Sequence, residues 1–180
     1  MEYWTDLYKE IAARITDNLP EIAWVDLWHE QVNYLTEELP FPVPAVFLAF
    51  DTIQTDDRGK LIQDCNTQID MYLFYETFSD TYTGSLSQNS ALVFLNQLTR
   101  LHALFHGKSG STFSAIRRVE LRREDSGGAG NLYRISFQCL ITDYSAQRLF
   151  TESQTPSADI AISTRPTPPS YTEDEPFFHP

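Results

Sequence analysis

The sequence predicts an α+β domain in which two helices pack on a mainly antiparallel sheet of four to five strands. The predicted order is α-β-β-β-α-β-β, followed by an extended C-terminal arm. Two segments have apolar residues at helical spacing, and five others have the apolar or alternating pattern of strands. No connection requires a parallel crossover, so hairpins on one sheet are the economical solution. The 180 residues, 42% of them hydrophobic, suffice for one core.

The N-terminal segment predicts an amphipathic helix over residues 2–18, which Pro20 ends. Its apolar stripe consists of Trp4, Leu7, Tyr8, Ile11 and Ile15. Residues 22–28 then alternate as a strand does, with Trp24 and Trp28 on one face.

The next segment contains the clearest strand of the chain. Three prolines within residues 40–44 exclude regular structure and predict a stiff, extended lead-in to an apolar strand over residues 45–52. Residues 55–63 are highly charged and predict a loop. Residues 65–76 alternate, and one face carries Cys65, Thr67, Ile69, Met71, Leu73 and Tyr75.

A leucine-rich pattern predicts a long helix over residues 88–106, with Gly107 placed to end it. An arginine-rich strand is expected over residues 113–124. The glycine-rich turn at residues 125–130 then favours a hairpin with a last strand over residues 131–142.

The chain divides into a domain over residues 1–144 and an acidic, proline-rich arm over residues 145–180. The arm holds six of the ten prolines and shows no helical periodicity; residues 158–163 could form a short strand. A disordered tail is one interpretation. The other is an arm that docks on a neighbouring subunit, because its apolar residues exceed what a solvated tail needs. The candidate docking residues are Ile160, Ile162, Phe177 and Phe178.

Charge is distributed unevenly along the chain, whose net charge is −12. Residues 1–80 hold 16 acidic and 4 basic side chains, whereas residues 81–144 hold 7 basic and 4 acidic ones. This asymmetry predicts complementary faces and argues against general nucleic-acid binding. The two cysteines, the lack of a signal-peptide pattern, and the lack of an apolar run near roughly 20 residues favour a cytoplasmic protein.

The residue pattern does not predict catalysis, a cofactor or a metal site. His102 and His106 have the spacing of two metal ligands on a helix, but no third ligand accompanies them. Residues 29–30 match the start of an HExxH motif, but position 33 is an asparagine where the motif has its second histidine. No nucleophile elbow, P-loop or dinucleotide-binding glycine motif is found. We therefore expect that the protein is not an enzyme.

The arginine-rich strand carries Arg117, Arg118, Arg122 and Arg123 and is the unusual feature of the sequence. One interpretation is an edge strand whose charge protects it against aggregation. A second is a subunit interface that faces the acidic half of a neighbour. Phosphate binding is a third, although the overall negative charge opposes it.

The order of these elements resembles the tail terminator (tail completion, or neck) proteins of long-tailed bacteriophages and phage-tail-like particles. An N-terminal helix precedes a proline-led strand, Pro44-Ala45-Val46-Phe47, and a polar strand around Gln68-Ile69-Asp70. A leucine-rich helix follows from Ala91-Leu92 to Leu101, then His106-Gly107, Phe113-Ser114-Ala115-Ile116-Arg117-Arg118 and a closing hairpin. The resemblance covers most of residues 2–144, and the arm after Tyr144 departs from the compact family members.

The resemblance implies a structural subunit and not an enzyme. Such proteins form rings, commonly hexameric, that cap the tail tube and join it to the head. The implied partners are copies of itself, the tail tube protein and a head-completion or connector protein. DNA would cross the lumen without specific binding, and the protein would assemble in the host cytoplasm and reside in the virion. The alternatives are a small cytoplasmic enzyme or ligand-binding domain, and an interaction module outside any virus.

Overall fold

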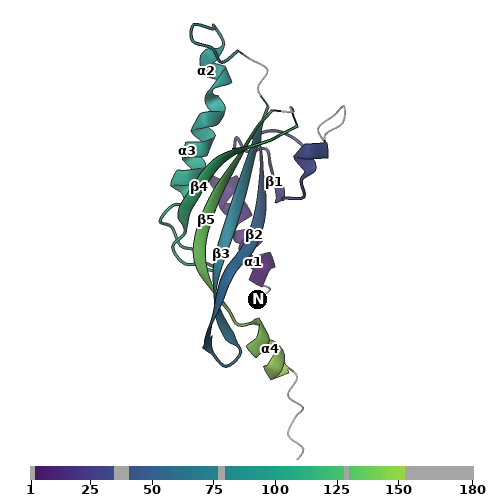
Figure 1. Cartoon of the computed structure of the whole chain (residues 1–180), viewed down its shortest axis with the longest axis vertical. Coiled ribbons are helices and arrows are strands. Elements are labelled where there is room, and N and C mark those ends of the chain that lie inside the picture. Colours follow the sequence, from purple (N-terminus) through teal and green to yellow (C-terminus); the bar gives the residue numbers. More distant parts are fainter. Residues whose placement is uncertain (1–2, 35–40, 77–79, 128–129, 153–180) are drawn as a thin grey trace, which may run out of the picture.

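A computed structural model describes residues 3–34, 41–76, 80–127 and 130–152. The helices are α1 (Tyr3–Asn18), α2 (Gln88–Ala91), α3 (Val93–Phe105) and α4 (Ser145–Glu152), and a short 3-10 turn, η1, spans Gln31–Tyr34. The strands are β1 (Trp24–Leu27), β2 (Ala45–Gly59), β3 (Ile62–Tyr75), β4 (Arg117–Glu124) and β5 (Asn131–Asp143) (Figure 1).

These strands form one mixed sheet with the order β1-β2-β3-β5-β4. The pairs β2–β3, β3–β5 and β5–β4 are antiparallel, and only the short strand β1 pairs in parallel, with β2. The predicted α+β class with a mainly antiparallel sheet is confirmed. The arginine-rich strand β4 lies at an edge, and the last strand β5 lies inside the sheet.

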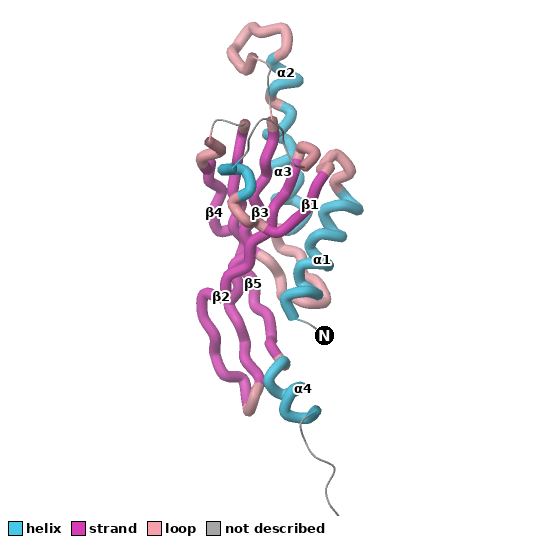
Figure 2. The backbone as a smooth tube through the Cα atoms, turned by 90° about the vertical axis from the view of Figure 1, so that its right-hand side faces the viewer, coloured by secondary structure: helices cyan, strands magenta, loops and turns pink. Residues whose placement is uncertain are grey.

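The main core lies between one face of the sheet and the helices α1 and α3, which both lie on that side (Figure 2). The alternating pattern of β3 and β5 builds the sheet side of this core, as the sequence predicts. Every second side chain of these strands is buried, and the helices add the other half. The central members are Leu7, Ile11, Ile15, Ile69, Met71, Leu101, Phe105, Ile135 and Phe137.

A second, smaller apolar cluster covers one end of the opposite face. Val32 of η1 and Phe41 of the proline-rich lead-in pack there against Phe47, Phe74 and other sheet residues. The rest of that face is mostly polar, with Leu140 as an exposed apolar exception. The lead-in therefore lies on the sheet and is not merely a spacer.

Trp4 does not join the core that the helical stripe predicts, because its side chain is 43% exposed. It lies beside Phe50 of β2, with a ring-centroid distance of 6.0 Å. Together with Tyr8 and Leu27 they line an apolar groove of about 320 Å³. The stripe of α1 thus covers the core from Leu7 to Ile15 and leaves Trp4 largely at the surface.

The charged loop expected over residues 55–63 is wrong. The strands β2 and β3 continue through this segment, and Gly59 still pairs with Ile62 across a turn at Lys60 and Leu61. These residues extend past α1 and α3 (Figure 2), and every side chain of β2 from Asp51 to Gly59 is exposed while the backbone keeps its ladder. The charged side chains of this segment therefore keep it exposed but do not prevent it from forming strands.

Two helix boundaries also differ from the sequence-based expectation. The long helix is divided into α2 and α3 at Leu92. Residues 145–152, expected to lack regular structure, form α4, and the Asp143 carboxylate accepts a hydrogen bond from the Ser145 N–H at its start (2.8 Å). The possible strand at 158–163 and the four candidate docking residues lie outside the described residues.

The Glu10 carboxylate joins α1 to the loop that leads into β4. It accepts hydrogen bonds from the N–H groups of Ser111 (2.8 Å) and Thr112 (2.9 Å) and from both hydroxyls (2.8 and 2.7 Å). Burial opposes ionisation of Glu10, but these hydrogen bonds outweigh burial and lower the pKa of Glu10 below its ordinary value. The loop is thereby fixed against the helix layer.

Replacing this carboxylate tests the connection. Glu10→Gln should lower the free energy of unfolding by about 1–3 kcal/mol at neutral pH, because charge-assisted hydrogen bonds are lost. A lowered folded-state pKa stabilises above the ordinary glutamate pKa, and that contribution is lost as the pH falls through the folded-state value. The difference from wild type, measured by urea denaturation, should therefore shrink in acid. Asp17→Asn, an exposed change on the same helix, is the control.

Truncation after Glu152 tests the proposed division of the chain. Every buried apolar residue of both described clusters precedes Asp143, so the truncated protein should keep its melting temperature to within a few degrees. Calorimetry of the two forms measures this. A collapsed melting transition would contradict the domain boundary and would place residues 153–180 in the core.

Candidate interaction surface

The four predicted interface arginines lie along β4 and point to both faces of the sheet. Arg117 and Arg122 are opposite Gln138 and Arg134 of β5 and share the face that α1 and α3 leave open. Arg118 and Arg123 are opposite the core strand residues Phe137 and Tyr133 and lie on the helix side. All four are exposed. The structure therefore brings them together as a row along one edge of the sheet.

Most of these arginines have no acidic partner within the described ranges. Among the described residues, no carboxylate oxygen lies within 4.0 Å of Arg117, Arg118 or Arg123. Arg122 lies 3.8 Å from Glu124, at the long end of the range for an ion pair. The edge strand thus presents positive charge that the domain itself leaves largely unbalanced.

A fifth arginine, which the sequence did not single out, explains this imbalance. Arg134 of β5 is largely buried and lies among three carboxylates: its Nε is 2.8 Å from Glu124, and its terminal nitrogens are 3.1 Å from Glu120 and 3.6 Å from Asp70. Burial opposes its charge, but Glu124 and Asp70 outweigh burial and raise the pKa of Arg134 above its ordinary value. In the sequence, the sign of this role was a basic residue, Arg134, in the middle of a predicted strand.

In this cluster the two glutamates of β4 point toward Arg134 instead of toward the free edge of the strand. Glu120 and Glu124 alternate with the arginines in sequence and would neutralise them on an isolated strand. In the fold both turn to Arg134 on the neighbouring strand. The side chains left at the edge are consequently cationic.

The opposite edge of the sheet is acidic. β1 covers the outer side of β2 only from Ala45 to Leu48, and the remainder of β2 has no strand on that side within the described chain. Asp51, Asp56 and Asp57 lie on this open stretch and are exposed. Neutral amides hold two of them: Gln54 donates to Asp56 (3.3 Å) and Gln63 donates to Asp57 (3.1 Å).

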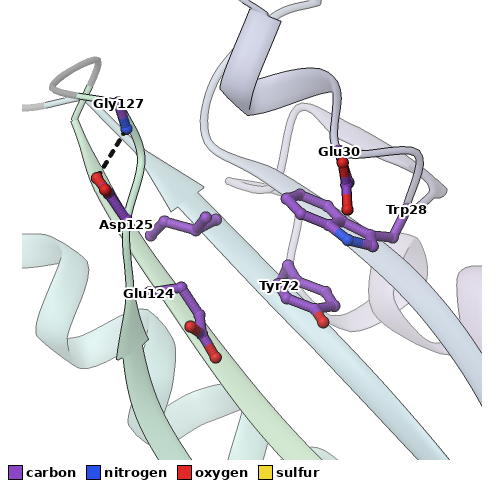
Figure 3. A pocket seen from close by; sticks show the side chains of 7 residues that line it. Trp28, Glu30, Tyr72, Glu124, Asp125 and Gly127 are labelled. Atoms are coloured by element: carbon purple, nitrogen blue, oxygen red, sulfur yellow. Dashed lines mark hydrogen bonds between the residues drawn. The ribbon is translucent and has the colours of Figure 1, made fainter.

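A groove of about 490 Å³ opens between the β4–β5 turn and the segment after β1 (Figure 3). Trp28 and Tyr72 stack in it with ring centroids 4.1 Å apart. Glu30 lies beside Trp28, and Asp125 faces them from the other wall. Glu30 has a φ of 58°, which is uncommon for a residue other than glycine. Aromatic faces bordered by carboxylates attract a positively charged group.

His102 and His106, which have the spacing of two metal ligands on a helix, lie close in space. The rings of His102 and His106 are 4.7 Å apart, and His106 Nδ1 accepts the N–H of Arg118 (3.2 Å). Burial and the nearby Arg118 lower the pKa of His102. In the part of the chain with described positions, no three His, Cys, Asp or Glu side chains converge as a metal site would need.

Both cysteines are buried and free, and burial raises the pKa of Cys139 to about 12. This keeps the thiol protonated and unreactive. Within the described ranges, the helices are too short or too polar to cross a membrane.

Comparison with known proteins adds a distant fold likeness. No protein-family model and no curated protein matches the sequence. A solved structure described as the virion of a native gene transfer agent (GTA) particle contains a similar chain. The match covers 79% of this chain and 98% of that one, with 9% sequence identity and a TM-score of 0.49. At this level the likeness carries no argument about function.

Removal of Arg134 tests the cluster. Arg134→Met should destabilise the protein by about 3 kcal/mol, because Asp70, 4% exposed, would remain as a buried charge with no cation beside it and only the neutral Gln68 amide as a hydrogen-bond donor. The double change D70N/R134M should be more stable than the single change, because it removes that charge. Denaturant unfolding measures both, with the exposed Arg122→Met as the matched control. Equal stability of the single and double variants would contradict this assignment.

Proposed function

We propose that the protein is a structural, ring-forming subunit at the tail end of a phage-like particle, where it caps the tail tube and joins it to the head. The observation that carries this proposal is the pair of open sheet edges, one cationic at β4 and one acidic on β2. A ring of identical subunits needs two different surfaces that fit one another, and these edges supply such a pair.

The sequence resemblance to tail terminator proteins supports the same proposal independently of the charges. Its elements occur in the fold in the expected order: α1, the proline-led β2, the polar β3, the helix α3 and the β4–β5 hairpin. The partners would be copies of itself, the tail tube protein and a head connector protein. The acidic surface would repel DNA phosphates, so DNA would pass through the ring without adhering.

The C-terminal arm has a part in this proposal. Ile160, Ile162, Phe177 and Phe178 would dock on a neighbouring subunit or on the tube. The truncation after Glu152 should then assemble poorly although it folds. Normal assembly of the truncated chain would favour a solvated tail.

A small-molecule-binding domain is the second candidate, and the groove at Trp28 and Tyr72 is the observation that favours it. Such a domain would be a monomer whose melting temperature rises with a cationic ligand. A ring subunit would instead show a closed oligomer whose stability depends on its edges. We rank this function second, because one groove supports it, whereas the two sheet edges and the sequence resemblance support the ring.

Native mass spectrometry and negative-stain imaging test the ring. The purified chain, alone or mixed with tail tubes of the particle whose genome encodes it, should form a closed ring of several copies that sits at tube ends. Formation should weaken as salt is added, because exposed charges are screened over about 8–10 Å at ordinary ionic strength. A strict monomer that never attaches to tube ends would exclude the proposal.

A further inference from the structure

The two open edges of the sheet differ in a way that selects a partner. At β4, seven of the eight residues are exposed, and on β2 every residue from Asp51 to Gly59 is exposed. An uncovered strand edge presents unpaired backbone groups that readily accept another strand. Apolar side chains accompany both edges: Ile53 is 50% exposed, and Val119 and Leu121 are 42% and 46% exposed. Pairing would cover them.

Like edges repel one another. Two β4 strands would bring arginines against arginines, and two β2 edges would bring aspartates against aspartates, and like charges directly opposite are destabilising in a sheet. The open stretch of β2 carries one basic residue, Arg58, beside its three aspartates, so the combination of β4 with β2 brings more opposite charges together than either pairing of like edges. The contact is therefore directional, from one surface of a copy to a different surface of the next.

We propose, building on the ring proposed above, that β4 of one copy pairs with residues 49–59 of β2 in a second copy and continues the sheet. The arginines Arg117, Arg118, Arg122 and Arg123 of one copy would face the aspartates Asp51, Asp56 and Asp57 of the other. The interface is thus a shared sheet with charge complementarity along its seam.

The register of the sheet gives this contact a stagger. Arg117 pairs with Gln138, Gln138 with Gln68, and Gln68 with Asp51. β4 is therefore level with the start of β2, whereas the open stretch of β2 runs on to Gly59. Each added copy is displaced along the strand direction. Closed sheets require such a displacement, because their strands tilt relative to the axis.

The β-bulges limit where pairing can occur. One interrupts the register of β2 between Thr52 and Gln54, and another interrupts β4 between Arg118 and Glu120. Bulges bend a strand and disrupt its ladder locally. They make unlimited edge-to-edge growth into fibres unfavourable and leave short matching segments for a defined contact.

A charge exchange between the two edges tests the proposal. The variant R122E/R123E and the variant D56R/D57R should each lose self-association, with an apparent dissociation constant raised by about a hundredfold, because like charges now meet at the seam. Mixing the two variants should restore rings with alternating subunits. The four-fold variant, with both edges reversed, should assemble by itself.

Matched controls separate the effect of charge at the seam from effects of total charge and of folding. Lys9→Glu with Lys108→Glu makes the same charge change as R122E/R123E at exposed positions outside both edges, and it should assemble as wild type does. All variants should keep the wild-type melting temperature, since the altered side chains are exposed. Native mass spectrometry of single proteins and mixtures reads out every state.

The outcomes distinguish a failure of the proposed interface from a failure of the proposed ring. Recovery in the mixture and in the four-fold variant supports the β4–β2 seam. If wild type forms rings but neither combination recovers, the seam is wrong and β4 faces another partner, such as the tube protein or the C-terminal arm. If wild type forms no ring under any condition, including with tail tubes, the proposed function fails as well.

Discussion

The burial of one face of β3 and β5 under α1 and α3 is the constraint on which the rest of the structure depends. Because side chains alternate along a strand, a slip of one residue would turn Ile69 and Phe137 to water and polar groups to the core. The register is therefore set by the apolar face. The residues that alternate with these apolar side chains lie on the opposite face, where Asp70 and Arg134 meet the carboxylates of β4.

That polar face determines the electrostatics of the edge. Arg134 lies next to β4 because β5 is inserted between β3 and β4. It forms ion pairs with Glu120 and Glu124, and of the four arginines of β4 only Arg122 has one of these carboxylates within 4.0 Å, at 3.8 Å from Glu124. An ion-pair network centred on Arg134 of β5 thus leaves a row of arginines at the edge of β4. The acidic edge arises differently, because β1 is too short to cover β2 beyond Leu48.

The helices and most strands could be predicted because their signals are local. Leu7, Ile11 and Ile15 repeat with the helical period, and Cys65, Ile69 and Met71 repeat with the strand period. The hairpin beyond Asp51 could not be predicted in this way. Its charges are typical of a loop, yet the ladder with β3 continues because the side chains of β2 from Asp51 to Gly59 stay exposed while the backbone pairs. α4 was missed because its short segment adjoins a proline-rich sequence.

The sequence by itself determined the period of each element, the alternation of β3 and β5, and the uneven charge along the chain, because these depend on residues close to one another. Only the tertiary structure decided which edges stay open and which charges stay unpaired. Strand order and the length of β1 decide which edges stay open. Contacts between residues far apart in the chain, such as Asp70 with Arg134, decide which charges are paired. Neither leaves a periodic trace in the sequence, since both depend on which strands become neighbours in space.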